Sequence, residues 1–254
     1  MSADPPEQLA EGTLISHLLE LRDRVLRAFL AVVLCFLPLA FFANDVFTFV
    51  AQPLIAKLPE GSSLIATSVV SPFMTPFKLA FFAGLFIAMP YVLYQAWAFV
   101  APGLYRHEKR FAVPLLLSSI VLFYVGIVFA YFAVFPVMFE FFSGTTPAGV
   151  RMMTDIAAYM DFVLTMFLCF GLAFEVPVIV VLLVLTRILT VEKLAAARGF
   201  VLIGIFVVAA LLTPPDAISQ TIMAVPMYAL YEGGLLMSRL LVRMRRDQAE
   251  EAEA

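Results

Sequence analysis

The chain has 254 residues, of which 63% are hydrophobic and 14% are charged, and its mean hydropathy is +1.00. A soluble domain is about 45–50% apolar and about 25% charged, so this composition excludes an ordinary soluble domain and predicts a protein of the lipid bilayer. The formal net charge of −3 says little, because much of the acidic surplus lies in the last few residues. Residues 1–20 lack the apolar core of a secretory signal peptide, so we expect the first apolar segment to direct insertion.

Six apolar segments follow one another along the chain. They comprise residues 25–43, 75–100, 113–136, 161–185, 199–213 and 218–238. A transmembrane helix needs about 20 residues at a rise of about 1.5 Å each, so the fifth segment would reach only about 22 Å. The sequence therefore predicts an all-α membrane protein whose six transmembrane helices form a concave bundle, with helices 5 and 6 short.

The positions of lysine and arginine predict the orientation of these helices. Thirteen of the sixteen basic residues lie on one side: before or at the start of the first segment, between the second and third segments, between the fourth and fifth segments, and after the sixth segment. The opposite loops hold only Lys57 and Arg151, and Lys78 lies in the second segment. Basic loops stay in the cytoplasm, so both termini are expected there. We divide the chain into a cytoplasmic N-terminal segment (1–24), a six-helix transmembrane domain (25–238) and a cytoplasmic tail (239–254). The tail is first basic and then acidic, and we expect it to be disordered from residue 247.

The outer loops and the prolines shape the expected bundle. Residues 44–71 and 143–158 are rich in apolar side chains or turn residues, so we expect short helices lying against the outer ends of the bundle. Pro38, Pro90, Pro177 and Pro226 lie well inside apolar segments, where proline bends a helix and frees backbone carbonyls. Curved helices form a concave wall more readily than straight ones.

The sequence contains none of the short motifs that carry common enzymatic chemistry. It has no phosphate-binding glycine loop, no HExxH, no GxSxG and no CxxC. The two histidines, His17 and His107, lie outside the apolar segments, whereas Cys35 and Cys169 lie inside them and resemble small hydrophobic residues. We therefore expect no enzyme activity, no cofactor and no metal site.

Several short phrases at helix ends are more specific than the composition. They are SHLLELRDR at 16–24, SPF at 71–73 with Lys78, YQAWAFVAPGLY at 94–105, HEKR at 107–110, FGLAFEVP at 170–177, LTPPD at 212–216 with Ser219 and Gln220, and YE at 231–232. In this order the phrases resemble the TatC family of twin-arginine protein translocation, over about residues 10–245. The resemblance implies a receptor for twin-arginine signal peptides that works with TatB and TatA and exports folded proteins on the proton-motive force.

Two carboxylates beside the inner membrane surface, Glu20 and Glu108, form the candidate signal-peptide site. A carboxylate suits arginine because two parallel N–H···O bonds can form, and the planar guanidinium makes arginine a better partner than lysine. The resemblance implies that both carboxylates hold the paired arginines, supported by Arg22 and by Phe99 packing against the peptide. Spacing alone leaves alternatives open: an i, i+4 ion pair of Glu20 with Arg24, a pair of Glu108 with a neighbouring basic residue, and a purely interfacial Phe99.

Glu175 is the most informative residue within an apolar segment, because an ionised carboxylate near mid-membrane costs several kcal/mol unless it is paired or hydrated. We expect it to face the short hairpin of the last two helices, with Gln220 in reach, and to offer a polar contact to a partner. The alternative is a neutral Glu175 bonded to a backbone carbonyl freed by Pro177. Asp216, Gln220 and Glu232 add polarity to the hairpin; their alternatives are an N-cap, an inter-helix hydrogen bond and a polar residue at the inner end.

Two other kinds of function remain compatible with such a chain. Glu175 could carry the proton of a secondary transporter, although such transporters often show internal repeats and this sequence has none. The other alternative is an intramembrane enzyme, but the sequence lacks the catalytic groups that such an enzyme would need. The basic cluster at 239–246 is most simply an anchor on anionic lipid rather than a nucleic-acid site. We expect homo- and hetero-oligomers in a bacterial inner membrane.

Overall fold

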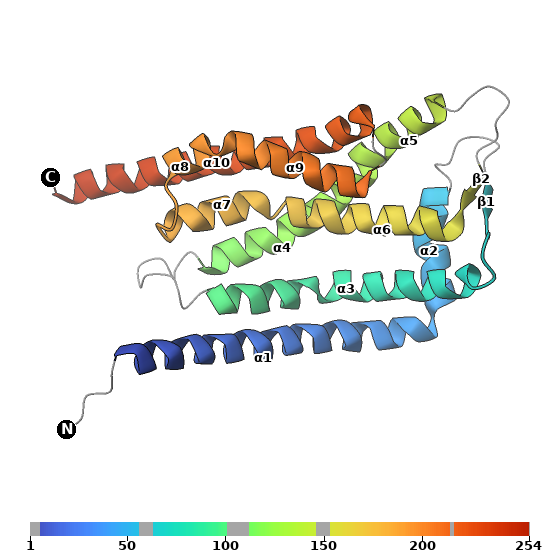
Figure 1. Ribbon diagram of the computed structural model, residues 1–254, viewed down its shortest axis with the longest axis horizontal. Helices are drawn as coiled ribbons and strands as arrows, with labels where there is room; N and C mark the ends of the chain where they lie inside the picture. The colour runs from blue at the N-terminus through green and yellow to red at the C-terminus, as the bar shows by residue number, and fades with distance from the viewer. Residues whose placement is uncertain (1–5, 56–62, 101–111, 146–152, 214–215, 254) are drawn as a thin grey trace.

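The computed structural model describes residues 6–55, 63–100, 112–145, 153–213 and 216–253, and these form a bundle of long helices (Figure 1). The first helix, α1 (Pro6–Phe41), lies at one edge of the bundle beside α3 (Ser71–Val100), and the shorter α2 (Ala43–Ile55) crosses the end between them. A Cβ atom at Gly84 of α3 would lie 2.9 Å from the Cα atom of Phe36, so α1 and α3 approach closely at this glycine. Helix α2 confirms the expected short helix in the first outer loop.

The third apolar segment forms one continuous but irregular helix. It comprises α4 (Ala112–Phe129), a π-helical turn η3 (Ala130–Val134) and α5 (Phe135–Gly144), and it runs obliquely across the bundle (Figure 1). Pro136, which has no N–H to donate and whose ring crowds the preceding turn, lies two residues after the π-helical turn. The helix continues to Gly144, about two turns beyond the predicted segment 113–136.

A small parallel strand pair at the end of the bundle opposite the termini was not predicted (Figure 1). Strand β1 (Ser63–Ile65) pairs with β2 (Met153–Asp155), so the all-α prediction holds for the bundle but missed this contact between its two outer loops. The Asp155 carboxylate accepts hydrogen bonds from the Thr67 hydroxyl at 2.6 Å and the Thr67 N–H at 2.9 Å. It also caps the next helix by accepting from the N–H groups of Ala157 and Ala158. These bonds, led by that of the Thr67 hydroxyl, lower the pKa of Asp155 to about 2.

The fourth apolar segment is broken into two helices, α6 (Ile156–Ala173) and α7 (Val176–Leu185). Pro177 has no N–H to donate to the carbonyl of Ala173, and Phe174 and Glu175 form a turn that interrupts the regular α-helix, although their dihedral angles stay in the right-handed helical region, before α7 resumes. The bend expected at Pro177 is thus confirmed as a break. By contrast, Pro38, Pro90 and Pro226 lie inside helices that stay continuous.

The last part of the chain forms a short helix, α8 (Val191–Ala196), and the hairpin of α9 (Arg198–Leu212) and α10 (Ala217–Glu253). Helix α9 has 15 residues, as predicted for the fifth segment. Helix α10 has 37 residues, so the prediction that helix 6 is short is wrong for the helix as a whole, although its apolar part ends much earlier. The expectation of a disordered tail is also wrong, because the backbone stays helical to Glu253 and its hydrogen bonds are satisfied within the helix.

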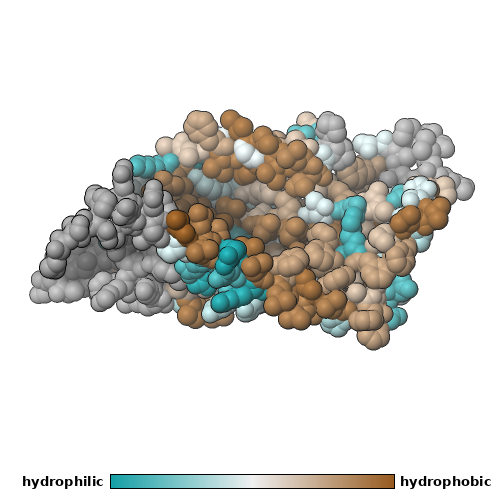
Figure 2. All heavy atoms as spheres, turned by 60° about the horizontal axis from the view of Figure 1, so that its bottom comes forward, coloured by the Kyte–Doolittle hydropathy of each residue, from teal (hydrophilic) through white to brown (hydrophobic). Residues whose placement is uncertain are grey.

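The apolar composition of the helices matches a membrane protein. Four helical stretches are long and apolar enough to cross a bilayer, namely 15–41, 71–100, 112–142 and 156–185, and α9 is a shorter apolar helix. The prediction of six crossings therefore stays a prediction for α9 and α10. Large apolar side chains cover much of the visible surface (Figure 2), as expected of a surface that faces lipid. The start of α1 and the end of α10 lie at the same end of the bundle (Figure 1).

Candidate functional site

The candidate receptor site lies where α1 and α3 run side by side near the start of α1. Glu20 is held by its own helix, because Arg24 donates to Glu20 Oε1 from Nε at 3.0 Å and from Nη2 at 2.6 Å. The i, i+4 pairing that spacing allowed is therefore confirmed. The other oxygen, Oε2, lies 4.0 Å from His17 Nδ1, and the Glu20 side chain is 37% exposed. Glu20 thus keeps one oxygen that no arginine of the described chain occupies.

Phe99 joins this site from α3. Its ring stacks on His17 with the ring centroids 4.3 Å apart and the planes inclined by 20°. His17 was missed as a site residue by the sequence reasoning, although it lies in the first resembling phrase. Arg22 does not reach Glu20, because its Nε and Nη2 donate to Asp23 Oδ1 at 3.0 and 2.8 Å. Glu108 lies outside the described residues.

An apolar groove runs from this site between α1 and α3. It has a volume of about 270 Å³, and Leu21, Arg24 and Val25 of α1 face Gln95, Phe99 and Val100 of α3 across it. Gln95 is 4% exposed, and its Oε1 atom has no hydrogen-bond partner within the described chain. The groove can therefore accept an apolar chain, and it offers that chain one amide oxygen.

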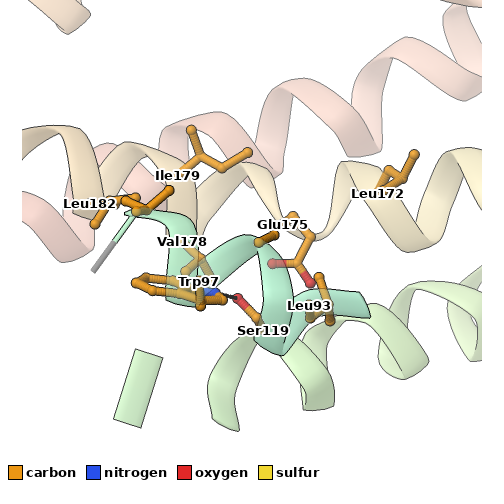
Figure 3. A pocket seen from close by; sticks show the side chains of 10 residues that line it. Leu93, Trp97, Ser119, Leu172, Glu175, Val178, Ile179 and Leu182 are labelled. Carbon is orange, nitrogen blue, oxygen red and sulfur yellow. Dashed lines mark hydrogen bonds between the residues drawn. The ribbon is translucent and has the colours of Figure 1, made fainter. Parts of the chain in front are cut away.

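Glu175 lies in a second cavity, at the break between α6 and α7 (Figure 3). This cavity has a volume of about 310 Å³ and is lined mainly by apolar side chains from α3, α6 and α7, among them Leu93, Leu172 and Val178. The Glu175 side chain points into it beside Ser119 of α4, and the residue is 7% exposed. Its Oε1 atom has no hydrogen-bond partner among the described residues. A buried carboxyl with an open oxygen can bind a hydrogen-bonding group that enters from outside.

The prediction that Glu175 faces the hairpin of the last two helices is wrong. The side chains around it belong to α3, α4, α6 and α7, and Gln220 is not among them. The physical reason is that another face of α7 is already occupied by α10. A Cβ atom at Gly234 of α10 would lie 2.8 Å from the Cα atom of Pro177, so the two helices meet backbone to backbone there.

The three polar residues of the hairpin occupy separate positions. Asp216 caps α10 by accepting from the N–H of Ser219 at 2.7 Å, which confirms the N-cap alternative. Glu232 binds Arg198 of α9 through both carboxylate oxygens, at 2.5 and 2.8 Å, and accepts from the Tyr228 hydroxyl at 2.9 Å. Glu232 thus joins α9 to α10. Gln220 is half-buried near the start of α10. The structure does not bring these residues together with Glu175.

The chain is similar to proteins of one family over most of its length. The sequence model of the family described as Sec-independent protein translocase protein (TatC) matches residues 16–226. A Sec-independent protein translocase protein TatC of Azotobacter chroococcum mcd 1 is 53% identical over 244 residues, which are 96% of this chain and 95% of the relative. The protein of the same name from Escherichia coli (strain K12) is 53% identical over 237 residues, covering 93% and 92%.

A solved structure agrees with these relatives. The crystal structure described as twin arginine translocase receptor TatC superposes with a TM-score of 0.79 at 37% sequence identity, and the match covers 88% of this chain and 98% of that chain. The same receptor solved in the detergent DDM gives a TM-score of 0.79 at 36% identity. The described helices, the ordered phrases and these matches agree, and the chain belongs to the TatC family of Sec-independent protein translocase proteins.

Proposed function

We propose that this chain is the signal-peptide receptor and core subunit of a twin-arginine translocase in a bacterial inner membrane. In this role it binds twin-arginine signal peptides and, together with TatB and TatA, exports folded proteins on the proton-motive force. Membership of the TatC family supports the proposal. The observation that carries it is a partly exposed carboxylate, Glu20, placed beside Phe99 and an apolar groove at the edge of the bundle.

The geometry suits a peptide that carries positive charge followed by an apolar stretch, which is the general design of a signal peptide. An incoming guanidinium binds the open oxygen of Glu20 or displaces Arg24 from the other one. Exchange costs little, because one arginine–carboxylate pair replaces another of the same kind. The apolar stretch that follows then lies along the groove beside Phe99 and Val100. We assign the second arginine to Glu108, and we assign Arg22 a supporting charge.

Photocrosslinking tests this assignment directly. A photoreactive residue at Leu21, in the groove wall, is combined with signal peptides that carry either Arg-Arg or Lys-Lys. The changes Glu20→Ala and Glu108→Ala should each lower crosslinking of the Arg-Arg peptide about tenfold or more, since a hydrogen bond to a charged group contributes about 1.5–3 kcal/mol.

Glu192→Ala provides the matched control, because it removes an exposed carboxylate of α8 that lies outside the groove. It should leave crosslinking of the Arg-Arg peptide unchanged. Crosslinking that survives at full strength in the Glu20→Ala, Glu108→Ala double variant, at normal protein level, would remove this site from the proposed function.

We further propose that both termini and the basic loops lie in the cytoplasm. In a variant without Cys35 and Cys169, single cysteines at positions 57 and 151 should react with an impermeant reagent added outside the membrane. A cysteine in place of Lys193 should not react, because it lies at the end of the bundle where most basic residues cluster. Labelling of position 193 from outside would reverse the orientation.

The buried carboxyl of Glu175 is proposed to bind a polar group of a partner helix during export. Glu175→Gln keeps the size and the hydrogen-bonding capacity, whereas Glu175→Ala removes both. If hydrogen bonding is what matters, the Gln variant should export a folded twin-arginine substrate and the Ala variant should be impaired; if charge matters, both should fail. Full export by Glu175→Ala at normal protein level would show that the carboxyl has no part in transport.

A further inference from the structure

The Glu175 cavity contains a second polar side chain that the family phrases do not include. Ser119 of α4 lines this cavity and is 0% exposed. The indole N–H of Trp97, from α3, donates to Ser119 Oγ at 3.1 Å (Figure 3). Three separate elements, α3, α4 and the α6–α7 break, therefore place Trp97, Ser119 and Glu175 side by side around one cavity.

The direction of these contacts follows from the chemistry of the groups. An indole N–H can only donate, so the Ser119 oxygen is the acceptor of that bond and its hydroxyl proton stays available. The Glu175 carboxyl lines the same cavity as Ser119 and can accept that proton. Glu175 Oε1 is buried and remains without a partner in the described chain. Trp97 thus orients Ser119, the Ser119 hydroxyl has a proton to offer to the carboxyl beside it, and Oε1 is left unpaired.

We infer that Ser119 is a positioning residue, oriented by Trp97, that aims the open oxygen of Glu175 into the cavity for a hydrogen-bonding group of an inserted helix. Without the serine hydroxyl, the carboxyl in an apolar cavity would turn toward any other donor within reach, because a buried polar atom left unpaired is costly. The inference rests on the proposed function in one respect, namely that Glu175 is used during export.

The chain offers a matched control and a built-in probe. Ser118 is the neighbour of Ser119 on α4, but its hydroxyl donates to the carbonyl of Leu115 in its own helix at 2.8 Å. Trp97 is the single tryptophan of the sequence, so the tryptophan fluorescence of the purified protein reports on this cavity alone. Ser119→Ala and Ser118→Ala remove the same hydroxyl group from adjacent positions and differ in the bond to Trp97.

The experiment measures fluorescence and export for Ser119→Ala, Ser118→Ala, Glu175→Ala and the Ser119→Ala, Glu175→Ala double variant. Ser119→Ala frees the indole N–H, so the Trp97 emission should shift to shorter wavelength, and Ser118→Ala should leave it unchanged. Ser119→Ala should lower export about two- to tenfold, the effect of one hydrogen bond, at normal protein level. The double variant should export no less than Glu175→Ala alone, because both changes disable the same contact.

The outcomes separate the inference from the proposed function. Export by the unaltered protein, in cells that lack their own TatC, tests the function itself. Given that export, wild-type transport by Ser119→Ala, an equal loss in Ser118→Ala, or losses that multiply in the double variant would overturn the positioning role. An unchanged Trp97 emission in Ser119→Ala would overturn the link from Trp97 to Ser119. Restoration of export by Ser119→Thr, which keeps the hydroxyl, would support it.

Discussion

Helix α1 at the edge of the bundle and the broken helix α6–α7 near its middle carry the two polar sites, and they are buried to different degrees. In the most apolar stretch of α1, 6% of the residues are buried within the protein, against 56% in the stretch that spans α6 and α7. Glu20 on α1 is bound by an arginine of its own helix, whereas Glu175 is enclosed by side chains of α3, α4, α6 and α7.

This difference indicates two different ways of using a carboxylate. At the edge, the ion pair of Glu20 is partly exposed and weak, so one arginine can replace another at little cost. In the middle, the environment of Glu175 is fixed by packing, and a group that binds there must fit a cavity that already exists. The Glu20 site at the edge is suited to exchanging one ligand for another. The Glu175 site in the interior is suited to aligning a ligand.

Gly126→Ala should give the largest loss of stability, because it acts on the packed interior. Its Cβ atom would lie 2.4 Å from the carbonyl oxygen of Phe170, a backbone atom that cannot move aside without shifting α6. We expect a loss of about 1–3 kcal/mol, measured by thermal or denaturant unfolding of the purified protein in detergent.

Gly204→Ala on α9 is the control for this variant, since nothing lies within 4 Å of its Cβ position. It should leave stability unchanged or raise it slightly, because alanine favours a helix more than glycine does. Equal unfolding temperatures for the two variants would contradict the close packing of α4 on α6.

Gly84→Ala makes a comparable clash at the edge, where a Cβ atom would lie 2.9 Å from the Cα and N atoms of Phe36. Helix α1 packs mainly on α3 and can move outward, so the loss should lie at the low end of the same range, about 1 kcal/mol. The displaced α1 should also widen the groove and weaken signal-peptide crosslinking. A loss as large as that of Gly126→Ala would show that α1 is held as firmly as the interior helices.

Arg24→Gln tests whether the peptide arginine competes with Arg24 for Glu20, because it removes the arginine that occupies Glu20 Oε1. Binding of an Arg-Arg signal peptide, measured by titration of the purified protein, should become up to about fivefold tighter, which corresponds to about 1 kcal/mol. Arg27→Gln removes the same charge three positions along the helix and should not tighten binding. Weaker binding in Arg24→Gln than in Arg27→Gln would mean that Arg24 assists the peptide rather than competing with it.

The smallest effect is expected at the outer end, from Asp155. Its pKa is lowered to about 2 in the folded protein from an ordinary value of 3.8, so the carboxylate stabilises the fold fully above that ordinary value. The contribution is lost as the pH falls from about 4 toward 2. The protection of the Thr67, Ala157 and Ala158 amides from hydrogen exchange, relative to the intrinsic rate at each pH, should fall over this range, and Asp155→Asn should remove that pH dependence.

The sequence predicted the features that depend on local composition. Helix α9 begins and ends within one residue of the predicted segment 199–213, because apolar runs and the prolines after Thr213 determine it locally. The cap at Asp216 and the Glu20–Arg24 pair also follow from short spacings. Such contacts can be predicted without knowing how the helices pack.

Features that depend on contacts between distant elements could not be predicted in this way. The direction of the Glu175 side chain depends on Gly234. Because this glycine lets α10 approach the backbone of α7, α10 occupies another face of α7. Ser119 reads in the sequence as one more small residue of a transmembrane helix, and its role emerges only from the positions of Trp97 and Glu175. The helical tail was missed because its charged composition resembles a disordered segment.

The pairing of β1 with β2 has a consequence for how the protein is made. Ser63 pairs with Met153, 90 positions later, and the two helices α3 and α4 have to be threaded into the bilayer in between. At about 5–20 residues per second, a ribosome needs roughly 5 to 18 s to synthesise the intervening chain. Strand β1 can therefore pair with β2 only after this delay, once both strands lie on the same side of the bilayer. The strand pair thus forms late in synthesis, when the first half of the bundle is joined to the second.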